Sequence, residues 1–103
     1  MNRVRFIAPA RTEFLHEIAY YREVDRQLSD RFDAAVQEAA ARALAFPRSG
    51  TPGDRNTRSL VIQGFPFRLI YRAESGGIVI VAIAHHSRKP QYWRDRATGS
   101  DHD

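Results

Sequence analysis

The sequence predicts one α+β domain in which a helical hairpin packs on a small antiparallel sheet. Its 103 residues are within the usual size of a single domain. The first half of the chain carries two apolar stripes at helical spacing, and the second half carries three short runs of strand-forming residues. We therefore expect the order β-α-α-β-β-β in two layers over residues 1–96, followed by a flexible polar tail at 97–103.

The first element is expected to be a short strand over residues 3–8, Arg-Val-Arg-Phe-Ile-Ala. These residues begin with alternating polar and apolar side chains, which is typical of a strand with one buried face. Pro9 follows and suits the first turn of a helix, where its missing N–H leaves no hydrogen bond unmade. A helix is therefore expected to begin directly after this strand.

Two apolar stripes at helical spacing predict two helices that pack as a hairpin. The first stripe consists of Phe14, Ile18, Tyr21, Val24 and Leu28. The second stripe consists of Phe32, Val36, Ala39, Ala43 and Phe46. Between the stripes, Ser29 or Asp30 is expected to cap the second helix, because their side-chain oxygens accept from free N–H groups. Pro47 is expected to end that helix.

Residues 47–57 are rich in Pro, Gly, Ser and Asp, so they predict a loop. Three strands are expected after it, over residues 58–63, 67–73 and 78–85, with short turns at 64–66 and 74–77. The last run is almost entirely β-branched residues and alanine, which is typical of a strand buried on both faces. Pro90 is expected to open a short C-terminal helical turn that includes Tyr92, Trp93 and Arg96.

The composition excludes several classes of protein. No apolar run approaches the ~20 residues needed to span a bilayer, and no signal-peptide core is visible near the N-terminus. The absence of cysteine excludes a disulfide framework, a thiolate zinc site and a cysteine nucleophile. We expect a cytoplasmic protein that contacts no membrane and needs no cofactor.

The charge is distributed unevenly along the chain. Residues 10–46 carry five arginines against seven acidic residues, whereas residues 47–96 carry eight arginines and Lys89 against three acidic residues. The C-terminal half is therefore the basic half. This asymmetry favours an anionic partner, although an arginine-rich composition also arises from GC-rich coding sequence. A nucleic-acid-binding module without further activity would show the same basic half.

The order of elements and several motifs together resemble the ParE/RelE superfamily of toxins. Residues 17–21, Glu-Ile-Ala-Tyr-Tyr, are similar to that family's first helix, and residues 46–52, Phe-Pro-Arg-Ser-Gly-Thr-Pro, to the exit from its second. Residues 64–72, Gly-Phe-Pro-Phe-Arg-Leu-Ile-Tyr-Arg, resemble its hairpin motif. The most specific match is residues 83–96, Ile-Ala-His-His-Ser-Arg-Lys-Pro-Gln-Tyr-Trp-Arg-Asp-Arg, which resemble its closing motif.

This resemblance implies a growth-inhibiting toxin of a type II toxin–antitoxin system, of the kind that stabilises plasmids. Such a toxin is neutralised by a cognate antitoxin, ParD-like or RelB-like, in a hetero-oligomer. ParE-like members of the superfamily inhibit DNA gyrase, whereas RelE-like members cleave mRNA on the ribosome. The resemblance by itself leaves both targets open.

The residues favour the ParE-like alternative. Metal-independent mRNA cleavage needs groups that deprotonate the ribose hydroxyl and protonate the leaving oxygen. The candidates for catalysis are Arg68 and Arg88, which would supply positive charge, and His85 and Tyr92, which would supply a proton. No acidic residue lies between Arg55 and Glu74, so the sequence offers no obvious general base in the second and third strands. We therefore expect gyrase as the target and mRNA cleavage as the alternative.

Binding residues are expected on the basic half of the chain and on the first helix. The candidates for contact with the target or another anion are Arg58, Arg68, Arg72, His86, Arg88, Lys89, Arg94 and Arg96. The candidates for antitoxin contact are Phe14, Ile18, Tyr21, Arg58, Arg68 and Arg72. Residues of this kind also have structural roles: His85 continues the spacing of Val79, Val81 and Ile83, and Trp93 is expected to close the core. No metal site is expected, because His85 and His86 point to opposite faces of a strand.

Overall fold

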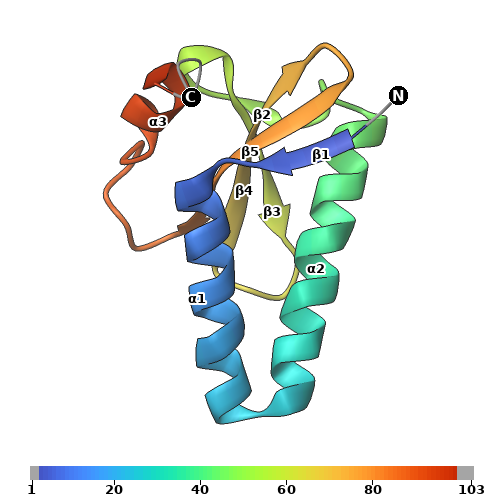
Figure 1. Ribbon diagram of the computed structural model, residues 1–103, viewed down its shortest axis with the longest axis vertical. Helices are drawn as coiled ribbons and strands as arrows, with labels where there is room; N and C mark the ends of the chain where they lie inside the picture. Colours follow the sequence, from blue (N-terminus) through green and yellow to red (C-terminus); the bar gives the residue numbers. More distant parts are fainter. Residues whose placement is uncertain (1–2, 100–103) are drawn as a thin grey trace.

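The computed structural model describes residues 3–99 and confirms the α+β class. Figure 1 shows two long helices side by side with the sheet against them. The elements are β1 (Arg3–Phe6), α1 (Ala8–Val24), α2 (Arg26–Ala45), β2 (Thr51–Pro52), a 3-10 turn η1 (Asp54–Asn56), β3 (Arg58–Ile62), β4 (Phe67–Glu74), β5 (Gly77–His85) and α3 (Arg94–Gly99).

Several boundaries differ from the sequence-based prediction. The first strand ends at Phe6 and α1 already begins at Ala8, and the break between the helices lies at Asp25 rather than at Ser29 or Asp30. Two further differences lie in the second half of the chain. The two-residue strand β2 lies inside the segment predicted as a loop, where it pairs with the start of β3. The last helix begins at Arg94 rather than at Pro90, and it extends three residues into the expected flexible tail. The remainder of that tail, residues 100–103, lies outside the described residues.

The helical hairpin turns at a single residue, Asp25. Pro9 lies in the first turn of α1, as expected. The Asp25 carboxylate accepts the backbone N–H of Gln27 at 2.9 Å and so caps α2, which makes the prediction of Ser29 or Asp30 as the cap wrong. Ser29 is instead a buried residue inside α2 whose hydroxyl donates to the Ile18 carbonyl at 3.0 Å. This bond fixes α2 against α1 close to the turn.

The sheet is mixed rather than antiparallel throughout. Its strand order is β1-β5-β4-β3-β2, and β3, β4 and β5 form the expected antiparallel meander. The first strand pairs with the last in parallel, with Arg3 opposite Gly77 and Phe6 opposite Ile80. The helical hairpin is the crossover that makes this parallel pairing possible, because parallel neighbours cannot be joined by a tight turn.

A register shift in the β4–β5 pairing changes which side chains share a face. Ile70 pairs with Ala82, but the next residue, Tyr71, pairs with Ile80. On one side of the shift Ile83 lies opposite Leu69, so these two side chains share one face of the sheet. On the other side Val79 lies opposite Arg72, and these two side chains lie on the opposite face. The predicted common face for Val79 and His85 is therefore wrong, because a β-bulge adds one residue to β5.

The core lies between the helical hairpin and one face of the sheet. Phe32 is fully buried at its centre, and its ring contacts Phe14, Tyr21 and Phe67 at centroid distances of 6.1, 5.2 and 5.5 Å. Tyr71 is also fully buried, and its hydroxyl donates to the Pro47 carbonyl at 2.7 Å. The same hydroxyl accepts the Gly50 N–H at 3.1 Å. Tyr71 thereby holds the chain where it leaves α2.

Trp93 covers part of the opposite side of the sheet. It is only 6% exposed and belongs to the buried apolar cluster, as expected from the sequence. Among the described residues, no helix is both long enough and apolar enough to cross a membrane.

Candidate binding cleft

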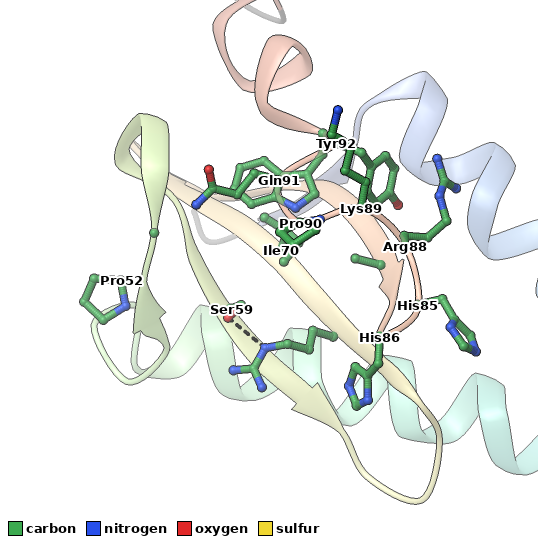
Figure 2. Close-up of a pocket in the computed structure, with 14 residues that line it drawn as sticks. Pro52, Ser59, Ile70, His85, His86, Arg88, Lys89, Pro90, Gln91 and Tyr92 are labelled. Atoms are coloured by element: carbon green, nitrogen blue, oxygen red, sulfur yellow. Dashed lines mark hydrogen bonds between the residues drawn. The ribbon is translucent and has the colours of Figure 1, made fainter.

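A cleft of about 550 Å³ lies between the sheet and the segment that follows β5. One wall comes from Pro52, Ser59 and Arg68, and the other from His86 and residues 88–93. Figure 2 shows Lys89, Pro90 and Gln91 above the cleft, with Ser59 and His86 on its other side. The sheet thus supplies a rigid floor, and the chain after β5 supplies an overhanging rim.

The cleft is basic. Its lining includes Arg68, Arg88 and Lys89 together with His85 and His86, and none of its 14 residues is acidic. The Arg68 guanidinium donates to the Ser59 hydroxyl at 3.0 Å and to the Thr51 hydroxyl at 3.5 Å. These partners are neutral, so they orient the Arg68 side chain without cancelling its charge. The arrangement favours an anion that enters from solvent.

His85 closes the turn that leads from β5 into the rim. Its Nδ1 accepts the Ser87 backbone N–H at 2.9 Å and lies 2.7 Å from the Ser87 hydroxyl. A ring nitrogen that accepts from a backbone N–H carries no proton, so these contacts assign the proton of the neutral ring to Nε2. The edge of the ring packs on Phe67 at a centroid distance of 5.0 Å. His85 is therefore engaged in structural contacts.

Glu13, which the sequence did not single out, anchors the rim from α1. Its Oε1 accepts the Ile83 N–H at 3.0 Å, and its Oε2 accepts from the Tyr92 hydroxyl at 2.7 Å and from Arg96 Nη2 at 2.9 Å. Strand β1 pairs with β5 only as far as Ile80, so the backbone beyond that point has no neighbouring strand on this side. Glu13 supplies the missing acceptor there.

The electrostatics of this anchor keep the Tyr92 hydroxyl protonated. Burial raises the pKa of Tyr92 well above its usual range, and the hydrogen bond to the Glu13 carboxylate raises it further. Two cations lie over the Tyr92 ring, Arg88 at 3.9 Å and Arg96 at 5.0 Å from the ring centroid. The ring thus supports Arg88 at the edge of the cleft.

Residues 4–90 match the family described as "ParE toxin of type II toxin-antitoxin system, parDE". This chain belongs to the ParE toxin family. This match confirms the resemblance inferred from the motifs and assigns the chain to the ParE branch of the superfamily.

A solved structure titled "Chromosomal ParDE TA system from P. aeruginosa" is similar, with a TM-score of 0.69 and 17% sequence identity. The similarity covers 82% of this chain and 96% of that one, and at this identity it supports the fold alone. No match was found among curated proteins.

The ParE-family fold brings together only some of the residues predicted to bind an anion. Arg68, His86, Arg88 and Lys89 line the cleft. The others do not line it: they are Arg58, Arg72, Arg94 and Arg96. All four interact with other groups of the protein.

Arg58, Arg94 and Arg96 bind groups in other segments of the chain. The Arg58 guanidinium donates to the carbonyls of Arg48 and Gly50 at 3.1 and 2.9 Å. Arg94 pairs with Asp54 at 3.2 Å, and Arg96 pairs with Glu13. Of the residues predicted to bind an anion, the cleft therefore gathers Arg68 from β4 with His86, Arg88 and Lys89 from the segment after β5.

The apolar residues predicted to contact an antitoxin face the protein interior. Phe14, Ile18 and Tyr21 are half-buried and pack against the core. The exposed apolar side chains of α1 are different ones, Leu15, Tyr20 and Val24, with 50, 57 and 62% exposure. The helical spacing therefore identified the buried face of α1 at Phe14, Ile18 and Tyr21 but was wrong at Val24, the last residue of the helix. Phe46 of the second stripe is likewise exposed, at 65%. Contact of Phe14, Ile18 and Tyr21 with an antitoxin stays a prediction.

Proposed function

We propose that this ParE-family toxin inhibits growth by binding DNA gyrase and that a cognate, ParD-like antitoxin neutralises it. The observation that supports this proposal is the character of the cleft. It gathers Arg68, Arg88 and Lys89, and no carboxylate lies among its lining residues. Such a site attracts and holds an anionic partner, whereas acid–base chemistry needs a group that is free to accept a proton.

Two of the cleft side chains that are suited to proton transfer, His85 and Tyr92, are already engaged in hydrogen bonds. His85 Nδ1 already accepts hydrogen bonds from Ser87, and the Tyr92 hydroxyl already donates to Glu13. Burial and Glu13 raise the pKa of Tyr92, so its hydroxyl is a weaker acid than an exposed tyrosine. Both groups make hydrogen bonds that hold the rim in place. This favours a toxin that acts by binding rather than by catalysis.

Neutralisation by an antitoxin follows from the family and from the charge. The chain has a net charge of +4 and a cleft without acidic residues, so an acidic partner chain is electrostatically favoured. We infer a toxin–antitoxin hetero-oligomer in the cytoplasm.

A supercoiling assay tests the target. Purified toxin is expected to inhibit gyrase-dependent supercoiling of relaxed plasmid, and prior mixing with the antitoxin should restore it. Uninhibited supercoiling at a toxin excess, together with arrested translation in a cell-free extract, contradicts this target.

The second candidate function is ribosome-dependent mRNA cleavage. One observation favours it: all four predicted catalytic residues, Arg68, His85, Arg88 and Tyr92, line the same cleft. This function predicts new mRNA 5′ ends after toxin induction, and their loss in Arg68→Ala and His85→Ala. An mRNA map that is unchanged by induction eliminates it.

A further inference from the structure

We propose that α2 carries a self-complementary surface through which two copies of this chain form a closed dimer. This α2 surface consists of Leu28, Arg31, Ala34, Ala35 and Glu38, which line one groove of the molecule. The inference is independent of the proposed function, because it concerns the toxin alone and a part of the molecule that is separate from the basic cleft.

The groove beside α2 has a firm apolar floor. It has a volume of about 390 Å³ and lies between α2 and the turn that joins β3 to β4. Its apolar lining includes Leu28, Ala35 and Phe65, which are half-buried. The Phe65 ring is fixed by the rings of Phe32 and Tyr21, at centroid distances of 5.1 and 5.2 Å. In Figure 1, α2 forms one side of the molecule and α3 lies at the other. A partner can therefore approach α2 without meeting the C-terminal segment.

The two charged residues of this groove have opposite signs and lack an opposite charge within the described part of the chain. Arg31 and Glu38 are both exposed, and neither takes part in an ion pair among residues 3–99. The positions three and four residues away from Arg31 along α2 hold only uncharged side chains, Gln27, Leu28, Ala34 and Ala35. A second chain can supply the opposite charge that α2 itself does not place beside Arg31.

A two-fold axis brings these charges together. Arg31 and Glu38 are seven positions apart, so they lie two turns and about 10 Å apart on one face of the helix. When a second copy of α2 packs antiparallel with the axis between Ala34 and Ala35, Arg31 of each copy lies opposite Glu38 of the other. The small alanine side chains at the axis let the two helices approach closely. One surface thus supplies both halves of the contact, as a closed dimer requires.

Charge favours a second copy over a ligand of one sign. An acidic or a basic peptide would attract one of the two charged residues of the groove and repel the other, whereas a second copy satisfies both. The same symmetry places Arg42 opposite the neutral Gln27, so no like charges meet there. Residues 10–46 carry seven acidic residues against five arginines, so the helical half of the chain lacks the basic excess that would repel another copy.

The dimer leaves the basic cleft open. Arg68 and Ile70 of β4 line the cleft, whereas Phe67 packs on Phe32 of α2 with 5.5 Å between ring centroids. Successive residues of a strand point to opposite faces of the sheet, so the cleft and α2 lie on opposite faces. A dimer formed through α2 therefore presents two clefts that both lie outside the interface.

Sedimentation velocity of the purified toxin tests the proposal. We expect monomer to give way to dimer as the concentration rises from about 5 µM to about 1 mM, with no larger species, because a closed interface is used up when two copies meet. Monomer alone throughout this range, or growth beyond the dimer, would overturn the proposal. A toxin that stays monomeric but loses affinity for its antitoxin in Arg31→Glu would assign the α2 surface to the antitoxin instead, and would also overturn it.

Two charge-reversal variants and their mixture locate the interface. Arg31→Glu places carboxylates opposite each other at both ends of the interface, and Glu38→Arg places guanidinium groups there. Each variant alone should therefore dimerise at least about tenfold more weakly than the unchanged chain. An equimolar mixture of the two variants should recover the dimer, because opposite charges again face each other between unlike copies. Single variants that dimerise normally, or a mixture that dimerises no better than either variant alone, would refute this interface.

A change at the two-fold axis has a matched control on α1. Ala34→Arg places two bulky cations at the centre of the interface and should weaken the dimer at least about tenfold. Ala19→Arg adds the same side chain at an exposed position of α1 and should leave the dimer unchanged. Both positions are exposed, and circular dichroism spectra check that both variants are folded. An equal loss in the two variants would show that added charge, rather than the α2 surface, controls self-association.

Discussion

Glu13 and Arg96, which are 83 residues apart in the sequence, form an ion pair with 2.9 Å between Oε2 and Nη2. Both side chains are largely shielded from solvent, with 18 and 22% exposure. Arg96 Nη1 also donates to the Val81 carbonyl at 3.4 Å. A single carboxylate on α1 thus connects the first helix, the last strand and the segment that forms the rim of the cleft.

Replacing Glu13 should destabilise the protein. Glu13→Gln keeps an acceptor for the Ile83 N–H but removes the charge that pairs with Arg96. We expect the free energy of unfolding to fall by about 1–3 kcal/mol, because the Arg96 guanidinium is left partly buried without its counter-ion. Urea denaturation measures the change. Glu23→Gln, on the exposed side of α1, is the control and should have almost no effect.

Removing the Tyr71 hydroxyl should destabilise the segment that follows α2. Tyr71→Phe leaves the Pro47 carbonyl and the Gly50 N–H without their partner. We expect a loss of about 1–3 kcal/mol in the free energy of unfolding, since groups deprived of a buried partner bear a desolvation penalty. The matched change Tyr20→Phe affects a side chain that is 57% exposed and should leave the thermal midpoint unchanged. Equal midpoints for the two variants would show that the Tyr71 hydroxyl is dispensable.

Two glycines should respond differently to alanine. At Gly77 a Cβ would overlap the carbonyl oxygen of Arg3 on the neighbouring strand, so Gly77→Ala should disrupt the β1–β5 pairing. At Gly64 a Cβ meets nothing within 4 Å, and only the φ of +86° opposes alanine. We expect Gly64→Ala to cost about 1 kcal/mol and Gly77→Ala several times more. Hydrogen exchange of the β1 amides would detect the local loss in Gly77→Ala, and native protection there would contradict the predicted clash.

Alkaline pH should lower the stability of the protein through Tyr92. Burial, followed by the hydrogen bond and charge of Glu13, raises the pKa of Tyr92 in the folded state above that of an unfolded chain. A group with a raised folded-state pKa contributes stability below its unfolded pKa of about 10, and that contribution declines as the pH rises through and beyond this value. The free energy of unfolding, measured between pH 8 and about 11, should therefore decline less steeply in Tyr92→Phe than in the natural sequence. Parallel slopes for the two proteins would exclude this linkage.

The elements that follow from local chemistry were predictable. The apolar stripes of Phe14 and Phe32 define the buried faces of the two helices, and the turns at 64–66 and 74–77 define the meander. His86, Arg88 and Lys89 lie within four positions of one another, so their gathering at one site was also accessible from the sequence. In each case the pattern that carries the information spans only a few residues.

The features that depend on distant partners were not predictable from one sequence. Nothing near Glu13 distinguishes it from the other acidic residues of α1, because its partners Ile83 and Arg96 lie 70 and 83 residues away. The bulge that separates Val79 from the face of Ile83 is set by the pairing of two strands, not by either strand alone. Arg58 was predicted to meet an anion, yet it binds backbone carbonyls of a loop whose path no local pattern specifies.

The parallel pairing of β1 with β5 has a consequence for synthesis of the chain. Strand β1 is synthesised first but can pair only with residues 77–80 of β5. Most of the polypeptide must therefore leave the ribosomal tunnel before the sheet can close. A stop codon anywhere before Gly77 should therefore release a fragment whose β1 has no strand to pair with, so that the sheet cannot close. Premature stops along most of this gene should thus yield no folded copy of this ParE-family chain.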